Sequence, residues 1–182
     1  FLNAGPGYGG SCLPKDMKAL INFADKIGVT PTFLNEVEKT NQKQITNIIS
    51  LLEKKIGSIK KKRVSVLGTA FKPETDDIRD SISIKLIRKL IDKGANVIVH
   101  DPKAIENTKR VFSDKIEYTN SIINALTESQ CVIIMTYWKE YSRINNGMIG
   151  KMRKKIIIDT RRILADKNID ADYQAIGIGN NN

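Results

Sequence analysis

The stretch "RVSVLGTAFKPETDDIRDSISIKLIRKLIDKGANVIVHD", residues 63–101, decides the fold. It begins with a short β-rich run, passes through a polar loop into a helical pattern over residues 81–93, and ends in a second β-rich run. Ser81 can cap the start of that helix and Gly94 can stop it. One side of the helix is apolar through Ile84, Ile87, Leu90 and Ile91. The order strand, helix, strand is typical of two parallel strands joined by a covering helix.

The same alternation continues through the rest of the chain. Further strand-like and helix-like runs are "KAIENTKRVF", "IEYT", "SIINALTES", "CVIIMT" and "KIIIDT". Strands that alternate with helices predict a parallel sheet covered by helices on both faces. The predicted fold class is therefore α/β, with a Rossmann-like doubly wound parallel sheet over residues 61–182.

Residues 1–60 precede this sheet and have helical patterns. The run "PKDMKALINFADKIG" has the apolar spacing of a short amphipathic helix, with Pro14 in its first turn. Residues 32–56 then keep one apolar face over about 25 residues, or about 40 Å of helix. Because this is longer than the usual helix of a globular domain, we expect it to connect domains or to form a dimer.

The composition is that of an ordinary soluble protein of 182 residues, 41% hydrophobic and 27% charged. No apolar run is long enough to span a membrane and no leader opens the chain, so we expect a cytoplasmic protein without a membrane partner. The net charge of +10 fits an anionic ligand, such as a nucleotide diphosphate, or a nucleic acid. A nucleic-acid partner is disfavoured because the few aromatic residues are not interleaved with the lysines.

The segment "GPGYGGSCLPKD", residues 5–16, satisfies the dinucleotide pattern G-x-G-x-x-G through Gly5, Gly7 and Gly10. That pattern works between a buried strand and a helix, and the preceding "FLNA" is too short for a strand. Gly68 is the only glycine in the first turn of the predicted sheet, so that turn also lacks a pyrophosphate cradle. Binding of a sugar nucleotide at the carboxyl ends of the strands remains open.

The glycine segment instead delivers Cys12 to the N-terminus of a helix. Flanking glycines leave the thiol accessible, and both the helix dipole and Lys15 would stabilise a thiolate. We favour a reactive thiol, because a buried structural cysteine would not need the preceding "YGGS". Asp16 lies one turn further along; it either accepts a proton or holds a water near Cys12, or only stabilises the helix dipole. No disulfide to Cys131, which begins an apolar strand, is expected.

The loop "GTAFKPETDDIRDS", residues 68–81, carries two cations suited to phosphate oxygens, Lys72 and Arg79. Its neighbouring carboxylates, Asp76 and Asp77, are more typical of caps and ion pairs than of a metal site. No cluster in the sequence has the spacing of zinc ligands, so no metal is predicted.

The segment "IIIDTRR" places Asp159, Arg161 and Arg162 at the same edge of the sheet. One of the two arginines would reach an anionic ligand and the other would be solvated. His100 is the only histidine. We expect it to be structural rather than half of a dyad with Cys12, because no third member of such a site is identifiable.

Together, "FLNAGPGYGGSCLPKD", "VLGTAFKPETDDIRDS" and "IIIDTRR", in this order and spacing, resemble the carboxyl-terminal half of the UDP-glucose 6-dehydrogenase family. The resemblance covers essentially the whole chain. It implies an NAD-dependent enzyme that oxidises C6 of UDP-glucose twice and yields UDP-glucuronate. It implies that Cys12 captures the aldehyde as a thiohemiacetal, later a thioester, and that Asp16 assists proton transfer and water activation.

The resemblance also implies the binding residues and the domain organisation. Residues that match sugar-nucleotide contacts are Phe1, Leu2, Gly7, Tyr8, Gly9, Phe71, Lys72 and Arg161. Lys15 and Arg79 match residues near NAD. Residues 1–60 match the cysteine loop and the helices that connect and dimerise, and residues 61–182 match a UDP-sugar-binding domain. The family holds NAD in a separate amino-terminal domain, absent from these residues, so we expect the chain alone to be inactive.

Two alternatives stay open. GDP-mannose and UDP-N-acetylmannosamine dehydrogenases share this architecture, although "FKPETDDIR" and "GPGYGGSC" look closer to the glucose enzymes. A non-catalytic sugar-nucleotide-binding module is the other possibility.

Overall fold

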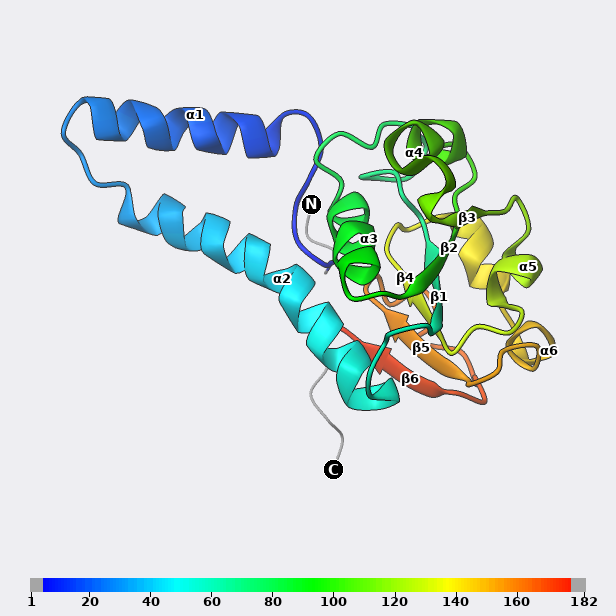
Figure 1. Ribbon diagram of the computed structural model, residues 1–182. Helices are drawn as coiled ribbons and strands as arrows, with labels where there is room; N and C mark the ends of the chain where they lie inside the picture. The colour runs from blue at the N-terminus through cyan, green and yellow to red at the C-terminus, as the bar shows by residue number, and fades with distance from the viewer. Residues whose placement is uncertain (1–4, 178–182) are drawn as a thin grey trace.

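The computed structural model describes residues 5–177, which form a parallel sheet flanked by helices, with two further helices projecting from one side (Figure 1). The strand order is β3-β2-β1-β4-β5-β6, and every pairing is parallel. The strands are β1 Arg63–Leu67, β2 Asn96–His100, β3 Glu117–Tyr118, β4 Cys131–Ile134, β5 Ile156–Asp159 and β6 Asp172–Ala175. The predicted fold class, a Rossmann-like doubly wound sheet, is confirmed.

The helices are α1 Leu13–Lys26, α2 Thr32–Ile56, α3 Ile82–Asp92, α4 Ile105–Phe112, α5 Ile122–Leu126 and α6 Asn146–Ile149, with 3-10 turns η1 Ser113–Lys115 and η2 Lys139–Arg143. α2 covers the predicted range of residues 32–56. The predicted caps of α3 are also present. The Ser81 hydroxyl accepts a hydrogen bond from the Ser83 N–H at 3.2 Å, and Gly94 adopts a φ of +76° that suits glycine.

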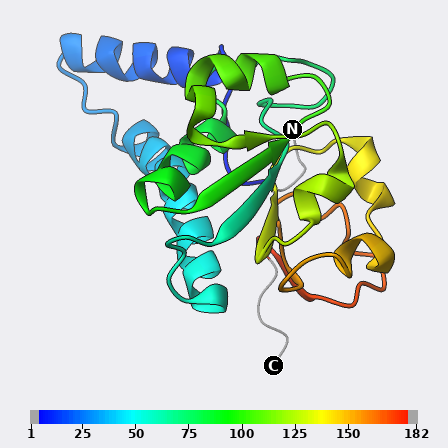
Figure 2. The same ribbon diagram turned by 45° about the vertical axis from the view of Figure 1, so that its right-hand side comes forward.

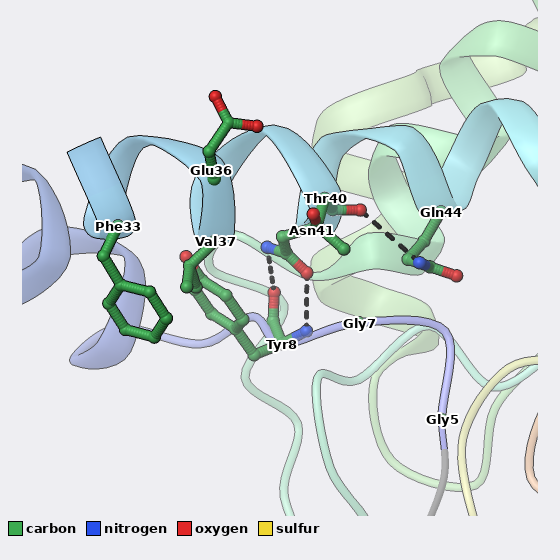
Figure 3. Close-up of a pocket in the computed structure, with 9 residues that line it drawn as sticks. All are labelled: Gly5, Gly7, Tyr8, Phe33, Glu36, Val37, Thr40, Asn41 and Gln44. Atoms are coloured by element: carbon green, nitrogen blue, oxygen red, sulfur yellow. Dashed lines mark hydrogen bonds between the residues drawn. The ribbon is translucent and has the colours of Figure 1, made fainter.

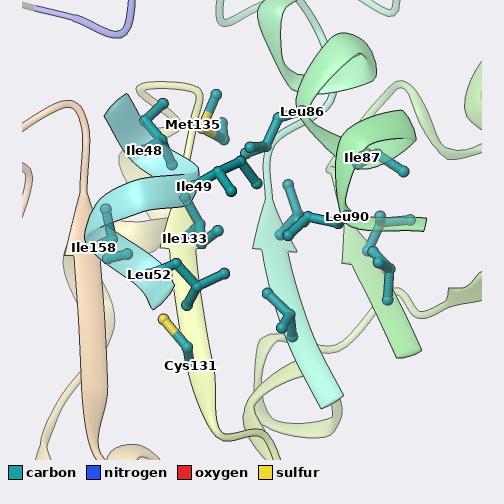
Figure 4. Close-up of a cluster of buried hydrophobic side chains, with 14 of the residues drawn as sticks. Ile48, Ile49, Leu52, Leu86, Ile87, Leu90, Cys131, Ile133, Met135 and Ile158 are labelled. Carbon is teal, nitrogen blue, oxygen red and sulfur yellow. The ribbon is translucent and has the colours of Figure 1, made fainter. Parts of the chain in front are cut away.

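One face of the sheet is covered by α2, α3 and α4, whose apolar side chains share a single core cluster. In Figure 4, Ile49 of α2 lies beside Leu86 of α3, above the central strands. Alternate strand residues complete this cluster: Val64, Val66, Cys131, Ile133, Ile156 and Ile158. Burial raises the pKa of the Cys131 thiol, so this cysteine stays protonated inside the core.

The opposite face is covered by α5, η2 and α6 (Figure 2). Here the intervening strand residues, such as Val132 and Ile134, pack with Leu126, Tyr141 and Ile149. The central strands are therefore buried on both faces, which explains why their sequences are nearly continuous apolar runs rather than alternating ones.

The two halves of α2 have different surroundings. Its carboxyl-terminal half lies on the sheet and is buried from Ile45 to Ile56, while its amino-terminal half extends away from the sheet with α1 beside it (Figure 1). Four positions of the apolar face predicted for residues 32–56, Ile45, Ile48, Leu52 and Ile56, are thus covered within the chain. Most of the exposed large apolar side chains lie on α1, in the following turn and at the start of α2: Leu13, Leu20, Phe23, Ile27, Val29 and Phe33.

Four of the elements described in residues 5–177 were not predicted: β6, α6 and the 3-10 turns η1 and η2. β6 is a short edge strand with the sequence "DYQA", which has too little apolar alternation to stand out. α6 is a single turn capped by the Asn145 side chain, which accepts from the Met148 N–H. Among the helices of residues 5–177, none combines the length and apolarity needed to cross a membrane.

Candidate functional site

The glycine-rich segment 5–12 crosses the carboxyl edge of the sheet and packs tightly against it. Four of its glycines have a neighbour so close that a Cβ would overlap it: Gly5 with the Arg161 guanidinium, Gly7 with the Asn41 amide, Gly9 with the Asp80 carbonyl and Gly10 with the Phe71 ring. Gly5, Gly7 and Gly10 are the three glycines of G-x-G-x-x-G. These glycines allow the close approach of side chains of the protein itself. In a dinucleotide-binding turn, the same pattern allows the close approach of a pyrophosphate.

The outer side of the loop is held by α2 (Figure 3). The Tyr8 N–H donates to Asn41 Oδ1 at 2.8 Å, and Asn41 Nδ2 donates to the Tyr8 carbonyl at 3.0 Å. The Tyr8 hydroxyl also donates to Glu38 Oε2 at 2.7 Å. Burial, helped by the Glu38 carboxylate, raises the pKa of Tyr8 to about 12, while the Tyr8 hydroxyl lowers the pKa of Glu38. Tyr8 is therefore a neutral donor to an ionised carboxylate at neutral pH.

Cys12 stands at the N-cap position of α1 with an exposed side chain. Its carbonyl accepts the Asp16 N–H at 2.9 Å, and its Sγ lies 3.6 Å from the Ser11 hydroxyl. The prediction that the glycine segment presents a cysteine at a helix start is thereby confirmed. Lys15 Nζ lies 3.4 Å from Asp16 Oδ1, and both side chains are exposed. The candidate acid or base thus shares the first helical turn with the thiol and is paired with a cation.

The loop after β1 packs against the cysteine loop. Phe71 packs on Gly10, and Lys72 Nζ lies 5.5 Å from the centroid of the Phe71 ring. Arg79 donates to both oxygens of Asp77, with Nη2 at 2.6 Å from Oδ2. Asp77 raises the pKa of Arg79, and the adjacent Asp80 carbonyl lies against Gly9 of the cysteine loop. Lys72 and Arg79 are thus both placed near the cysteine loop.

The acidic residues of this loop are already paired. Asp77 binds Arg79, which lowers the pKa of Asp77, and Asp76 accepts from Asn107 Nδ2 at 3.0 Å. Within residues 5–177, no group of three His, Cys, Asp or Glu side chains is placed to hold a metal ion.

The structure distinguishes the two adjacent arginines after β5. Arg161 is half-buried: its Nε donates to the Met135 carbonyl at 2.8 Å, and its guanidinium faces Gly5. Burial lowers the pKa of Arg161, which nevertheless remains charged because its ordinary pKa is so high. Arg162 is turned away and donates to the Ile176 carbonyl at 3.0 and 3.2 Å. Arg161 is therefore the arginine that the fold brings to the cysteine loop.

Two polar residues of this edge are structural. Asp159 is buried and accepts from the N–H groups of Arg161 and Leu164 and from the Tyr173 hydroxyl. Asp101 is also buried and accepts from five donors: the N–H groups of Thr69, Ala70, Lys103 and Ala104, and the Trp138 indole N–H. Asp101 thereby fixes the loop that leads to Phe71.

His100 is buried at the end of β2, with its Nδ1 3.1 Å from the Tyr141 hydroxyl and its Nε2 3.6 Å from Glu140 Oε1. Burial lowers its pKa and favours the neutral ring. Its partners are these two residues rather than Cys12, in agreement with a structural histidine.

Space around the loop is uneven. Between the loop and the sheet edge, near Pro6, Phe71 and Arg161, only about 10 Å³ is open. A cavity of about 460 Å³ lies on the other side, between the loop and α2, next to Tyr8 and Phe33 (Figure 3). A ligand of nucleotide size would therefore contact the outer surface of the loop or displace it from the edge.

Most of the predicted site residues are brought together. Gly7, Tyr8, Gly9, Phe71 and Arg161 meet at the loop and the sheet edge, with Cys12, Lys15 and Asp16 at the start of α1 and Lys72 and Arg79 in the loop after β1. Phe1 and Leu2 lie outside the described residues. Sequence reasoning missed Glu38 and Asn41. Both stand in the polar stretch "EKTNQKQ", and their partner, Tyr8, lies 30 and 33 residues away from them.

A doubly wound parallel sheet whose carboxyl edge carries a cysteine-bearing glycine loop and a half-buried arginine defines an α/β protein of the Rossmann-like class. Residues 65–166 match the UDP binding domain of the UDP-glucose/GDP-mannose dehydrogenase family, and residues 1–43 match the central domain of that family. The chain belongs to the UDP-glucose/GDP-mannose dehydrogenase family.

Individual relatives agree with this assignment. The chain is 40% identical over 176 residues to the UDP-glucose 6-dehydrogenase AglM of Haloferax volcanii, covering 97% of this chain and 40% of that protein. It is 34% identical to the UDP-glucose 6-dehydrogenase TuaD of Bacillus subtilis, with coverage of 97% and 39%. A UDP-glucose dehydrogenase structure from Pyrobaculum islandicum superposes with a TM-score of 0.86 at 34% identity, over 94% of this chain and 38% of that one. The chain thus spans about 40% of the length of these relatives.

Proposed function

We propose that this chain forms the sugar-nucleotide-binding and nucleophile-bearing part of a UDP-glucose 6-dehydrogenase. The observation that carries the proposal is the packing of the Cys12 loop directly on the carboxyl edge of the sheet, against Phe71 and the Arg161 guanidinium. Ligands of doubly wound sheets bind at this edge. The relatives named UDP-glucose 6-dehydrogenase, at 34–40% identity, support UDP-glucose as the substrate.

Four side chains are suited to the nucleotide. Arg161 and Lys72 supply cations for the diphosphate; Arg161 is the better held of the two, because its Nε is anchored on the Met135 carbonyl. Tyr8 and Phe71 supply aromatic surface at the cysteine loop and the sheet edge. We also propose the division into residues 1–60, with the cysteine loop and helices, and residues 61–182, the nucleotide-binding domain.

The chemistry assigned to the chain centres on Cys12 and Asp16. The Cys12 thiolate would add to the C6 aldehyde, forming a C–S bond and a thiohemiacetal whose oxidation gives a thioester. Water would then cleave the C–S bond, returning the thiol and releasing the carboxylate. Asp16, one helical turn away, is placed to take a proton from that water, and Lys15 Nζ lies 3.4 Å from its carboxylate.

NAD, when bound, supplies the hydride acceptor of each oxidation. Lys15 and Arg79 are exposed cations at the cysteine loop, and each is paired with a carboxylate. They could therefore contact only the periphery of a bound NAD. Within residues 5–177, neither the loop glycines nor Gly68, which packs on Thr136, leaves a pyrophosphate cradle. We therefore propose that NAD is bound chiefly by groups outside these residues, and that residues 1–182 alone form no NADH.

We further propose a homodimer that uses the projecting helices. Phe33, Phe23 and Ile27 are 76%, 59% and 59% exposed. Apolar side chains gathered in this way mark an interaction surface. A dimer would combine α1 with the amino-terminal half of α2, since the other half of α2 is covered by the sheet.

The experiment that tests the site is UDP binding to the 182-residue chain, measured by calorimetry for wild type, Arg161→Ala and the matched control Arg162→Ala. Loss of a charge-assisted hydrogen bond should weaken UDP binding in Arg161→Ala by roughly tenfold to a hundredfold. Arg162→Ala should bind as wild type does, because Arg162 faces Ile176. Absence of UDP binding, or equal losses in both variants, would contradict the proposed site. Tighter binding of GDP-mannose than of UDP-glucose would favour the other branch of the family.

A further inference from the structure

The buried side-chain amide of Asn41 is hydrogen-bonded to the backbone of the cysteine loop. Asn41 is 7% exposed, and its oxygen and nitrogen bind the N–H and the carbonyl of the same residue, Tyr8, at 2.8 and 3.0 Å (Figure 3). This pairing copies the way in which a neighbouring β-strand binds an extended residue. It satisfies both polar groups of Tyr8 at once and fixes the direction of the loop on either side.

Gly7 and Glu38 support the pair of hydrogen bonds between Asn41 and Tyr8. Gly7 has a φ of +110°, and a Cβ there would overlap Asn41 Oδ1. The amide and the loop can approach this closely only because residue 7 is glycine. Glu38, one turn earlier on α2, binds the Tyr8 hydroxyl as a second contact at 2.7 Å.

Asn41 is itself mounted on a rigid part of the fold. Ile45, one turn further along α2, begins the buried half of the helix, which continues through Ile48 and Leu52 in the core. The loop is therefore held on two sides. It packs against Arg161 and Phe71 at the sheet edge, and it is hydrogen-bonded to α2, which is anchored in the core.

We propose that Asn41 is a positioning residue, which holds the segment 5–12 in the shape that binds the nucleotide and presents Cys12. The proposal rests on the proposed function, since it assigns the loop to the nucleotide site. Asn41 acts through Tyr8 and contacts neither the thiol nor the arginine. A tether of this kind reduces the entropy that the loop would otherwise lose on binding its ligand.

The test compares Asn41→Ala with the matched control Asn47→Ala, an exposed asparagine on the same helix. Hydrogen exchange of the Tyr8 amide, UDP affinity and Tm are measured on each 182-residue chain. In Asn41→Ala the Tyr8 amide should exchange at least about tenfold faster, and UDP should bind about tenfold more weakly. Asn47→Ala should change neither quantity.

Faster exchange with unchanged UDP affinity, or a lower Tm without either change, would overturn the proposal. If Asn41→Ala does not fold, Asn41→Asp replaces it, because the carboxylate keeps the acceptor for the Tyr8 N–H and loses only the donor. Asn41→Asp should then weaken UDP binding while protection of the Tyr8 amide persists; unchanged UDP affinity would overturn the proposal. Should the wild-type chain bind no UDP, the proposed function fails, and the nucleotide role of Asn41 falls with it whatever the exchange rates are.

Discussion

Replacing Asp101 by asparagine should destabilise the protein strongly, although the two side chains have the same shape. The two carboxylate oxygens accept five hydrogen bonds, two on Oδ1 and three on Oδ2. Asparagine keeps one accepting oxygen, and its NH₂ group would face N–H groups on the other side. At least two donors then lose their acceptor, each at about 1–3 kcal/mol. The expected loss in the free energy of unfolding is about 2–6 kcal/mol, a large share of the stability of an ordinary domain.

The assay is urea unfolding followed by circular dichroism, with Asp25→Asn as the control. Asp25 is exposed on α1, where the same change of charge should alter stability by less than about 0.5 kcal/mol. A loss below about 1 kcal/mol in Asp101→Asn, or a loss equal to that of the control, would refute the reasoning that all five donors depend on a carboxylate.

Three other outcomes are expected. Leu52 of α2 is fully buried against the sheet, so Leu52→Ala should cost about 2–5 kcal/mol in urea unfolding. The exposed Leu20→Ala should cost far less, and equal costs would contradict the described core. Burial lowers the pKa of His100, so the unfolded chain binds more protons and stability should fall as pH drops below about 6.5. The free energy of unfolding, measured from pH 7 to pH 5, checks this. If its dependence on pH were the same in His100→Gln as in wild type, the reasoning would be contradicted. Light scattering should give the mass of two copies for wild type and of one copy for Phe23→Ser combined with Phe33→Ser; a wild-type monomer would overturn the dimer.

Features encoded by local patterns were predictable from the sequence. The alternation of short apolar runs with amphipathic stretches predicted the sheet, and the full length of α2 followed from one apolar face over residues 32–56. The caps of α3 were evident because Ser81 and Gly94 act on their immediate neighbours. The start of α1 at Cys12 was evident in the same way, from Pro14 and the glycines before it.

Features that depend on distant partners were not predictable from spacing. Asn41 lies among polar residues that resemble any exposed helix face, and only folding brings Tyr8 to it. The choice between Arg161 and Arg162 depends on the turn after β5, where Arg162 has a φ of +55° and points to Ile176. β6 depends on the edge that β5 offers, rather than on its own sequence.

The contrast between the two cysteines gives the chain a built-in reporter. Cys12 is exposed at the start of α1, whereas Cys131 is wholly enclosed between β4 and α2. A thiol reagent applied to the native protein should therefore attach a single label, at the cysteine loop, and a second label should appear only in molecules whose sheet has opened. Counting labels by mass spectrometry after a brief pulse would then follow global opening and loop accessibility in one sample, without introducing any residue.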